Sequence, residues 1–412
     1  MFKPVFGEIK LSERDDKNIK KRAIFFIGGF DPKSPKDFFG KLNRETERFE
    51  KLWDVSVTAD EIKSVSSDVA CTRYNSKSNN TSEQWTVKTD FHFLTLDDIV
   101  LKDFNRPFFT RFWRYTKTLA NYVFSGTAFA FIKHAWRFSL YFFYPMLMIF
   151  IAMLLSLVPA MMVANMNIPF AWLLAIPVFL GFFILCGKLG GNRYHVLHLM
   201  DLWSFSADFI KGDRQDINQK LDSYSDIIAE QVSSTHYDEV LLIGHSTGGA
   251  LILDVAGRAS ERHKGYENNC DAISILTLGS TALKIGLHPK ASKFRQRVKT
   301  LFSQPKYKWI EYQCLTDVIN FFRTDPAKLM GVDTKPIIRT IRVKEMLDKT
   351  TYARIKRNFF RVHYQFVFGN TKPNHFDFPA ICFGPAPILK RATEPHLFMN
   401  NLNCHSETER AS

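Results

Sequence analysis

The sequence predicts an α/β fold in which a mostly parallel sheet is flanked by helices and interrupted by an inserted two-helix transmembrane hairpin. Short apolar, β-rich runs recur along the chain, and in the C-terminal half they are separated by segments of helix length. The 50 residues between Arg137 and Lys188 include no Asp, Glu, Lys or Arg. One apolar run leads directly into a serine flanked by glycines.

The N-terminal part begins with an apolar run at 23–27, which ends in Gly-Gly-Phe and is typical of a buried strand followed by a turn. Residues 54–57 are a second strand candidate. Residues 61–90 are rich in Ser, Asn, Thr and Lys, so we expect a surface loop there.

Residues 104–137 carry six Lys or Arg, eleven aromatic side chains and no acid. Two interpretations fit this composition. The segment is either an amphipathic helix of the soluble domain or a collar at the membrane interface. In a collar the rings lie at headgroup depth and the cations meet lipid phosphates. We favour the collar.

The uncharged block divides at a turn into two apolar segments, at about 140–163 and 170–187. Each has roughly 20 residues, enough for a helix of about 30 Å. Basic residues flank both outer ends and the connecting loop has no charge, so we expect the hairpin to enter and leave from the cytoplasmic side. A re-entrant hairpin is the alternative. Three prolines are expected to kink or end these helices: Pro145, Pro159 and Pro177.

After the hairpin, residues 201–233 have a helical period, and apolar strand runs follow at 240–243, 273–278 and 309–314. Helix-length spacers between these runs indicate parallel strands joined by crossover helices.

The run at 240–243 continues into Gly244-His245-Ser246-Thr247-Gly248, a G-x-S-x-G motif followed by a helical sequence. A serine on a sharp strand-to-helix turn has a strained backbone, and the flanking glycines let the turn close. The hydroxyl is then presented at the carboxyl edge of the sheet. The alternative is a glycine-rich turn with an inert serine.

The sequence Gly-His-Ser-Thr-Gly-Gly at 244–249 resembles the nucleophile elbow of α/β-hydrolase lipases and esterases. Leu-Thr-Leu-Gly-Ser at 276–280 resembles the strand and turn that often follow it. Ile-Gly-Gly-Phe at 27–30 resembles their oxyanion loop, although isoleucine replaces the usual histidine. The resemblance covers residues 22–32 and 238 to about 385, and it implies an α/β-hydrolase-type sheet and serine hydrolase activity.

A nucleophilic serine needs a base and an orienting carboxylate, which α/β-hydrolases supply in the chain order Ser, acid, His. Asp317 follows a late strand and fits the acid, with Asp325 and Asp333 as alternatives. For the base we favour His363, which lies in an apolar segment, and keep His375 as the alternative.

The resemblance also implies an oxyanion hole. One donor is the backbone N–H of Thr247, the residue after the nucleophile, and the other is that of Gly29 or Phe30. His245 is expected to pack in the elbow without a catalytic role.

We expect four segments. Residues 1–103 hold the oxyanion loop and residues 104–200 the collar and hairpin. Residues 201–390 hold the elbow, and 391–412 form a polar tail. Six scattered cysteines and a charged N-terminus without an apolar stretch indicate a reducing compartment and no cleaved signal peptide. The hydrolase domain and both termini are therefore expected in the cytoplasm.

The net charge of +14 divides into +6 before the uncharged block (24 basic, 18 acidic) and +8 after it (31 basic, 23 acidic). This pattern favours an anionic lipid surface as partner over nucleic acid, for which no motif is present. No motif indicates a metal or nucleotide cofactor. The sequence thus predicts a membrane-anchored serine hydrolase that cleaves an ester, with a lipid ester suggested by location. The alternative is an inactive hydrolase-fold membrane scaffold.

Overall fold

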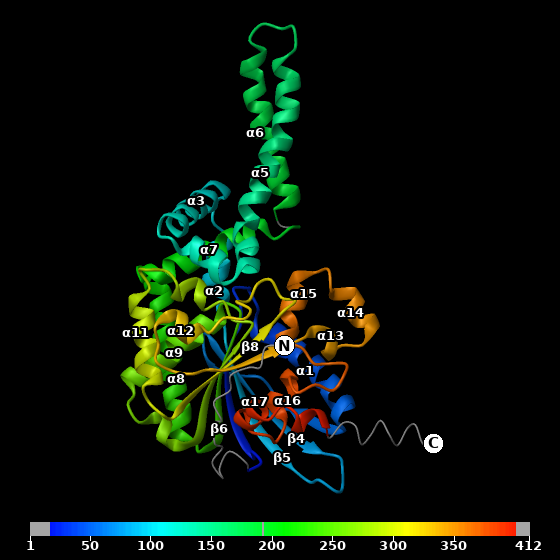
Figure 1. The fold of residues 1–412 in the computed structure, drawn as a ribbon, viewed down its shortest axis with the longest axis vertical. Coiled ribbons are helices and arrows are strands. Elements are labelled where there is room, and N and C mark those ends of the chain that lie inside the picture. Colours follow the sequence, from blue (N-terminus) through cyan, green and yellow to red (C-terminus); the bar gives the residue numbers. More distant parts are fainter. Residues whose placement is uncertain (1–16, 192, 401–412) are drawn as a thin grey trace. The chain divides into compact units, whose positions relative to one another are not determined.

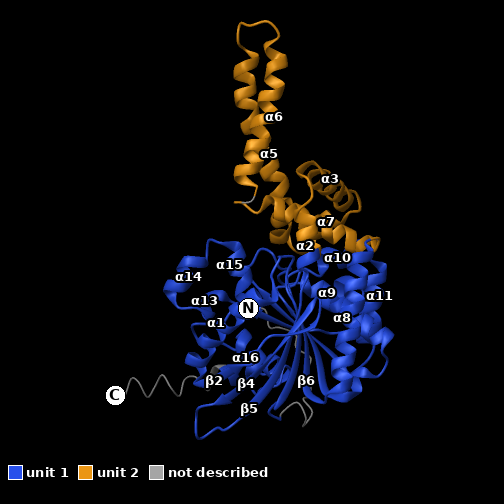
Figure 2. Ribbon diagram, turned by 180° about the vertical axis from the view of Figure 1, so that it is seen from behind, with its two compact units in different colours: residues 1–98, 214–412 blue, residues 99–213 orange. Residues whose placement is uncertain are grey.

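The computed structural model describes residues 17–191 and 193–400 and divides the chain into two compact units (Figure 2). Unit 1 comprises residues 1–98 and 214–412, and unit 2 comprises residues 99–213. Of the predicted polar tail, residues 401–412 lie outside the described residues.

Unit 1 contains a nine-stranded sheet in the order β2-β4-β5-β1-β6-β7-β8-β9, with β3 paired to β4. The five neighbouring pairs from β5 to β9 along this order are parallel, and the three pairs that involve β4 are antiparallel. The predicted sheet is confirmed as mixed and mostly parallel. The strands are β1 (Lys21–Ile27), β2 (Val55–Ala59), β3 (Lys63–Ser66), β4 (Val69–Ser78), β5 (Thr86–Leu94), β6 (Tyr237–His245), β7 (Cys270–Leu278), β8 (Tyr307–Cys314) and β9 (Ile337–Ile341).

Helices cover both faces of this sheet (Figure 1). On one face, α8 (Gln215–Ser234) and α11 (Ser292–Phe302) flank α9 (Gly248–Arg262), which packs on β1, β6 and β7. The other face is covered by α1 (Pro35–Trp53), α16 (Phe378–Phe383) and α17 (Ile388–Thr393). Shorter helices complete the unit: α10 (Leu283–Gly286), α12 (Pro326–Met330), α13 (Val343–Met346), α14 (Lys349–Ile355), α15 (Phe359–Tyr364) and α18 (Leu397–Asn400).

The main core lies between the sheet and the α1–α16–α17 layer. Alternate residues of the central strands point into it, for example Ile24 and Phe26 of β1 and Leu241 and Ile243 of β6. This two-residue period is what a pleated strand imposes. The intervening residues of both strands are buried too, because helices cover the opposite face.

The prediction of a surface loop at 61–90 is wrong, because β3, β4 and the first part of β5 occupy this segment. Some of the polar side chains that suggested a loop are buried in the fold, where they form hydrogen bonds. Ser76 Oγ donates to the carbonyl of Phe383, and Thr89 Oγ1 donates to the carbonyl of Cys382. Small hydroxyl side chains can occupy strand positions when a carbonyl satisfies them.

A fully buried ion pair joins the two central strands at their amino ends. Arg22 Nε donates to Glu239 Oε2 at 2.6 Å, and both side chains are at most 1 % exposed. The Arg22 guanidinium also donates to the carbonyls of Cys382 and Gly384, and Glu239 accepts from the backbone N–H of Ile388. Removing either partner would leave an unpaired buried charge, which costs about 3–5 kcal/mol.

Unit 2 is helical. The two predicted apolar helices are present as α5 (Trp136–Ala164) and α6 (Ala171–Gly190), which pack along each other and are long and apolar enough to cross a membrane. Both helices continue through their prolines. The other members are α3 (Phe108–Phe124), α4 (Thr127–His134) and α7 (Val196–Lys211); α2 (Asp97–Phe104) begins at the junction of the two units.

The structure shows two features of the collar segment. Arg111 and Arg114 of α3 form ion pairs with Asp201 and Asp208 of α7, so these two cations are not directed at lipid phosphates as the collar interpretation assumed. The segment also exposes large rings: Phe109, Trp113 and Phe124 on α3, Phe129 on α4 and Trp136 at the start of α5. An exposed aromatic surface of this kind is typical of an interaction site.

Candidate active site

The candidate site lies at the carboxyl ends of the two central strands. Because β1 and β6 are parallel neighbours, with Ile27 opposite Gly244, the turns that follow them come together. The strands that follow β1 in sequence, β2 to β5, lie on one side of β1 in the sheet, and β6 to β9 lie on its other side. Such a reversal of strand order is where open α/β sheets bind ligands.

Ser246 stands on the turn between β6 and α9, with a φ of 58°. This left-handed conformation is uncommon for a residue with a β-carbon and marks a strained turn. Hydrogen bonds hold it from both sides: the N–H of Ser246 donates to the carbonyl of Leu278, and its carbonyl accepts from Thr281 N–H, both at 3.0 Å.

The two elbow glycines are required by close backbone packing. A β-carbon on Gly244 would lie 2.3 Å from the carbonyl oxygen of Gly248, and one on Gly248 would lie 2.1 Å from that of Ile27. Neither position has room for a side chain. Gly29 is different, since its β-carbon would lie 3.7 Å from Ser246 Oγ. The predicted oxyanion loop therefore passes directly beside the serine.

Asp317 and His363 form a buried pair. His363, on α15, makes a 2.6 Å hydrogen bond through Nδ1 to Asp317 Oδ2, in the loop after β8. Their side chains are 4 % and 0 % exposed, so water is excluded from the contact. The ring also packs near the elbow, because a β-carbon on Gly279 would lie 3.2 Å from His363 Cε1.

The second ring nitrogen of His363, Nε2, is buried and has no hydrogen-bond partner in the described part of the chain. A buried polar atom without a partner is destabilising and is common where a substrate completes the site. No hydrogen bond joins Ser246 to His363 among the described residues. Such bonds are often long in free enzymes and shorten when substrate binds.

The alternative residues lie elsewhere. The carbonyl of His375 accepts from Arg391, and burial, together with Arg391 and Arg339, lowers the pKa of this histidine to about 4. Asp325 caps α12 by accepting from the N–H of Lys328. Between the two candidate bases, only His363 is hydrogen-bonded to the favoured acid.

The residues expected to supply the oxyanion donors lie on the same two turns. Thr247 is the N-cap of the 15-residue α9, where backbone N–H groups lack partners within the helix and the dipole favours negative charge. Gly29 and Phe30 follow β1 beside Ser246. The arrangement can stabilise an oxyanion on a carbonyl carbon bound to Ser246 Oγ.

Several supporting residues were not identified from the sequence. Asn320 holds the acid loop by donating to the carbonyl of Asp317 while its own Oδ1 accepts from Cys314 N–H. His245, expected only to pack, lies against His363 with the ring centroids 4.6 Å apart and the rings tilted, and it contacts the His363 carbonyl through Nε2 at 3.2 Å. The Asn320 contacts are local but belong to no motif, and the contact of His245 with His363 spans 118 positions.

Lys284 is a further buried group at the elbow. It is fully buried, and its Nζ donates to Thr247 Oγ1 at 2.8 Å. Burial lowers the pKa of this amine to about 7. In the sequence, Lys284 is marked only by its position six residues after the end of β7.

We expect Lys284→Met to change the pH dependence of stability. In the unfolded chain a lysine keeps its ordinary pKa near 10.4, so between pH 7 and 10 the unfolded state binds the additional proton. The free energy of unfolding of the wild type therefore rises with pH relative to the variant, by up to roughly 1.4 kcal/mol per pH unit. Unfolding measured at pH 7, 8 and 9 tests this. The exposed Lys293→Met is the control, and a difference that does not vary with pH would contradict the expectation.

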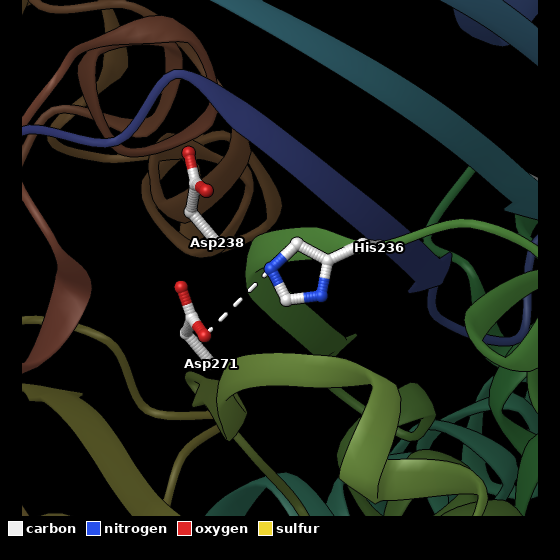
Figure 3. Close-up of side chains that lie close together, drawn as sticks. All are labelled: His236, Asp238 and Asp271. Atoms are coloured by element: carbon white, nitrogen blue, oxygen red, sulfur yellow. Dashed lines mark ion pairs between the residues drawn. The ribbon is translucent and has the colours of Figure 1, made fainter.

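One surface group of three possible metal ligands occurs among the described residues: His236, Asp238 and Asp271 (Figure 3). His236 lies 3.7 Å from Asp271, and Asp238 accepts from the backbone N–H groups of Lys20 and Lys21. The group is at the amino ends of β6 and β7, whereas Ser246 follows the carboxyl end of β6. It is therefore separate from the candidate site.

Comparison of the chain with protein-family models, with curated proteins and with solved structures finds no match.

Proposed function

We propose that this protein is a serine hydrolase of the lipase and esterase class that cleaves an ester through an acyl-enzyme on Ser246. The proposal is carried by one observation: the buried His363–Asp317 pair, with Nε2 of the histidine unpartnered among the described residues, packs against His245, the residue that precedes a serine held in a strained strand-to-helix turn. Buried titratable pairs beside a strained residue are typical of catalytic sites.

In the proposed reaction, Ser246 Oγ attacks the ester carbonyl carbon and its proton passes to His363 Nε2. Asp317 holds the ring and stabilises the imidazolium that forms. The N–H groups of Thr247 and of Gly29 or Phe30 stabilise the oxyanion. His363 then gives the proton to the departing alcohol, and water, activated by the same histidine, releases the acid.

The sheet supports an α/β-hydrolase assignment. The serine follows the central strand β6 and the oxyanion loop follows the neighbouring β1. The acid follows the late strand β8, and the histidine comes after β9. This is the chain order Ser, Asp, His that the resemblance implies. The chemistry needs no cofactor.

The test is labelling by a fluorophosphonate probe, which reacts only with an activated serine. The wild-type full-length chain, purified in detergent, is expected to be labelled, and Ser246→Ala is expected to show no labelling. Ser280→Ala removes the hydroxyl of another buried serine of the same region and is the matched control; it is expected to retain labelling. An unlabelled wild type, or equal labelling of Ser246→Ala, would support the inactive scaffold instead.

We further propose that α5 and α6 anchor the protein in a membrane, with unit 1 and both termini on the cytoplasmic side. Most large apolar side chains of the two helices are exposed, among them Leu147, Phe150, Leu155, Leu174 and Leu180. Lipid is the environment that accommodates such a surface. The exposed rings of α3, α4 and the first turn of α5 then lie at the interface, with Lys117 over the ring of Trp113 and Arg137 over that of Trp136.

A cysteine introduced at Asn167, between α5 and α6, tests this topology. We expect an impermeant maleimide to label Asn167→Cys only from the non-cytoplasmic side of oriented vesicles. Glu61→Cys, an exposed position in unit 1, is expected to react only from the cytoplasmic side. The labelling of the natural cysteines is measured on the wild type and subtracted. Reaction of both positions from one side would show that the hairpin does not cross.

A further inference from the structure

A groove of about 380 Å³ lies in unit 2, where α6 ends and α7 begins. Four helices line it, namely α3, α5, α6 and α7, and all of them belong to unit 2 (Figure 2). A single water molecule needs roughly 10–15 Å³ of such space, so the groove has room for an organic group. The groove does not include the residues of the candidate active site.

The walls of the groove are apolar. Phe108 and Phe112 of α3 form one wall, with their rings stacked at a centroid distance of 6.2 Å. Gly187 of α6 faces Phe108, because a β-carbon on this glycine would lie 3.8 Å from Phe108 Cε2. Since glycine has no side chain, it leaves space between α6 and the ring. Apolar walls of this kind favour a hydrocarbon group over water.

The groove is open toward the apolar surface of the hairpin. Ile151, Leu155 and Leu189 line the groove, yet they are 39 %, 58 % and 68 % exposed. The same side chains therefore belong to the surface that we propose to face lipid. Lipid acyl chains are the hydrocarbon groups adjacent to such a surface in a membrane, so an acyl chain can enter the groove without passing through water.

One cation lines the groove. Arg193 is the only charged residue among the described residues that line it, and none of these is acidic. Arg193 lies in the turn between α6 and α7, where the chain leaves the hairpin. Basic side chains at the ends of membrane helices attract anionic headgroups, and a guanidinium donates strong hydrogen bonds to phosphate oxygens. The groove thus combines hydrocarbon-binding walls with a group that binds phosphate.

We propose that this groove binds one acyl chain of an anionic phospholipid of the surrounding membrane, with Arg193 donating to the lipid phosphate. The bound lipid would contact α3, α5 and α6 together. The inference rests on the proposed anchoring of α5 and α6 in a membrane, and it does not depend on the chemistry proposed for Ser246.

The test is native mass spectrometry of the full chain, delipidated in detergent and titrated with phosphatidylglycerol or phosphatidylcholine of the same acyl chains. We expect the anionic phosphatidylglycerol to bind about fivefold more tightly, because one basic side chain near anionic headgroups contributes a difference of that size. Arg193→Gln is expected to abolish this preference. Lys188→Gln is the matched control: Lys188 is an exposed cation of α6 that does not line the groove, and its loss is expected to leave the preference unchanged.

Gly187→Leu tests the apolar part of the groove, because it places a side chain beside Phe108. We expect it to weaken the binding of both lipids at least about tenfold, the effect of displacing two methylene groups from apolar surroundings. Gly181→Leu is the matched control. It makes the same change on α6 at a position that does not line the groove, where an added β-carbon has open space around it in the described structure. Ala152→Phe, which fills the groove from α5, replaces Gly187→Leu if that variant does not fold.

Equal binding of the two lipids by the wild type would overturn the inference, and so would wild-type binding by both Gly187→Leu and Ala152→Phe. A dimer that binds no lipid would also overturn it, because the groove would then belong to a contact with a second copy of the chain. Carbonate extraction of membranes that hold the wild type tests the anchor separately. A chain that carbonate releases would contradict the anchor and this inference with it, whereas a retained chain that fails the lipid test would contradict this inference alone.

Discussion

His363→Ala is expected to reduce kcat for ester hydrolysis about 10⁴- to 10⁶-fold with little change in KM. The reason is that in the proposed reaction His363 accepts the serine proton and delivers it to the leaving alcohol. Its Nε2 is unpartnered within the described residues, and its Nδ1 is held by Asp317. Steady-state hydrolysis of p-nitrophenyl butyrate by wild type and variant measures the effect.

His375→Ala is the matched control for this experiment. The carbonyl of His375 accepts from Arg391, and its imidazole has Arg391 and Arg339 nearby in place of a carboxylate, so its loss is expected to change kcat less than about threefold. The reverse pattern, with His375→Ala inactive and His363→Ala active, would identify His375 as the base and contradict the proposed triad.

Asp317→Asn is expected to lower kcat about 10⁴-fold, or about 5.5 kcal/mol in activation free energy. The substitution keeps the shape of the side chain but can present an amide N–H to His363 Nδ1, which then favours the wrong tautomer and no longer stabilises the imidazolium. The stability of the fold is expected to change much less than the activity. Thermal unfolding measured beside kcat separates the two effects.

Asp325→Asn makes the same chemical change at the alternative acid. Asp325 caps α12 by accepting from Lys328 N–H, a role that asparagine also fills, so this variant is expected to retain wild-type kcat and stability. Equal losses of activity in both variants would indicate a general effect on the fold and would count against a specific role for Asp317.

The elbow was predictable because its signal is local. A strand, a glycine-flanked serine and a helix are adjacent in sequence, and the steric demand for Gly244 and Gly248 arises within this turn and its neighbouring strand. Asp317 could be proposed from its place after a late strand. His363 could be favoured over His375 only for its apolar segment, because the pairing itself depends on which segment folds back onto Asp317 across more than forty residues.

Other features could not be predicted from the sequence for a related reason. The composition of β3 to β5 is that of a loop, and two of their polar side chains, Ser76 and Thr89, become buried because carbonyls of the C-terminal region accept their hydrogen bonds. The composition of α3 suggested that its arginines bind lipid phosphates, whereas Arg111 and Arg114 form ion pairs with carboxylates of α7. In each case a polar side chain was satisfied by a partner distant in sequence, which composition does not reveal.

The insertion of unit 2 between β5 and β6 also sets an order of events during synthesis. Gly29 and Ser246 are 217 positions apart (246 − 29), with the whole hairpin between them. At about 5–20 residues per second, a ribosome needs roughly 10–40 s to travel from one to the other. During that interval β1 lacks its β6 neighbour, and α5 and α6 are synthesised before the interval ends. The two halves of the oxyanion hole can meet only afterwards, so the proposed hydrolase would remain inactive until its anchor had left the ribosome.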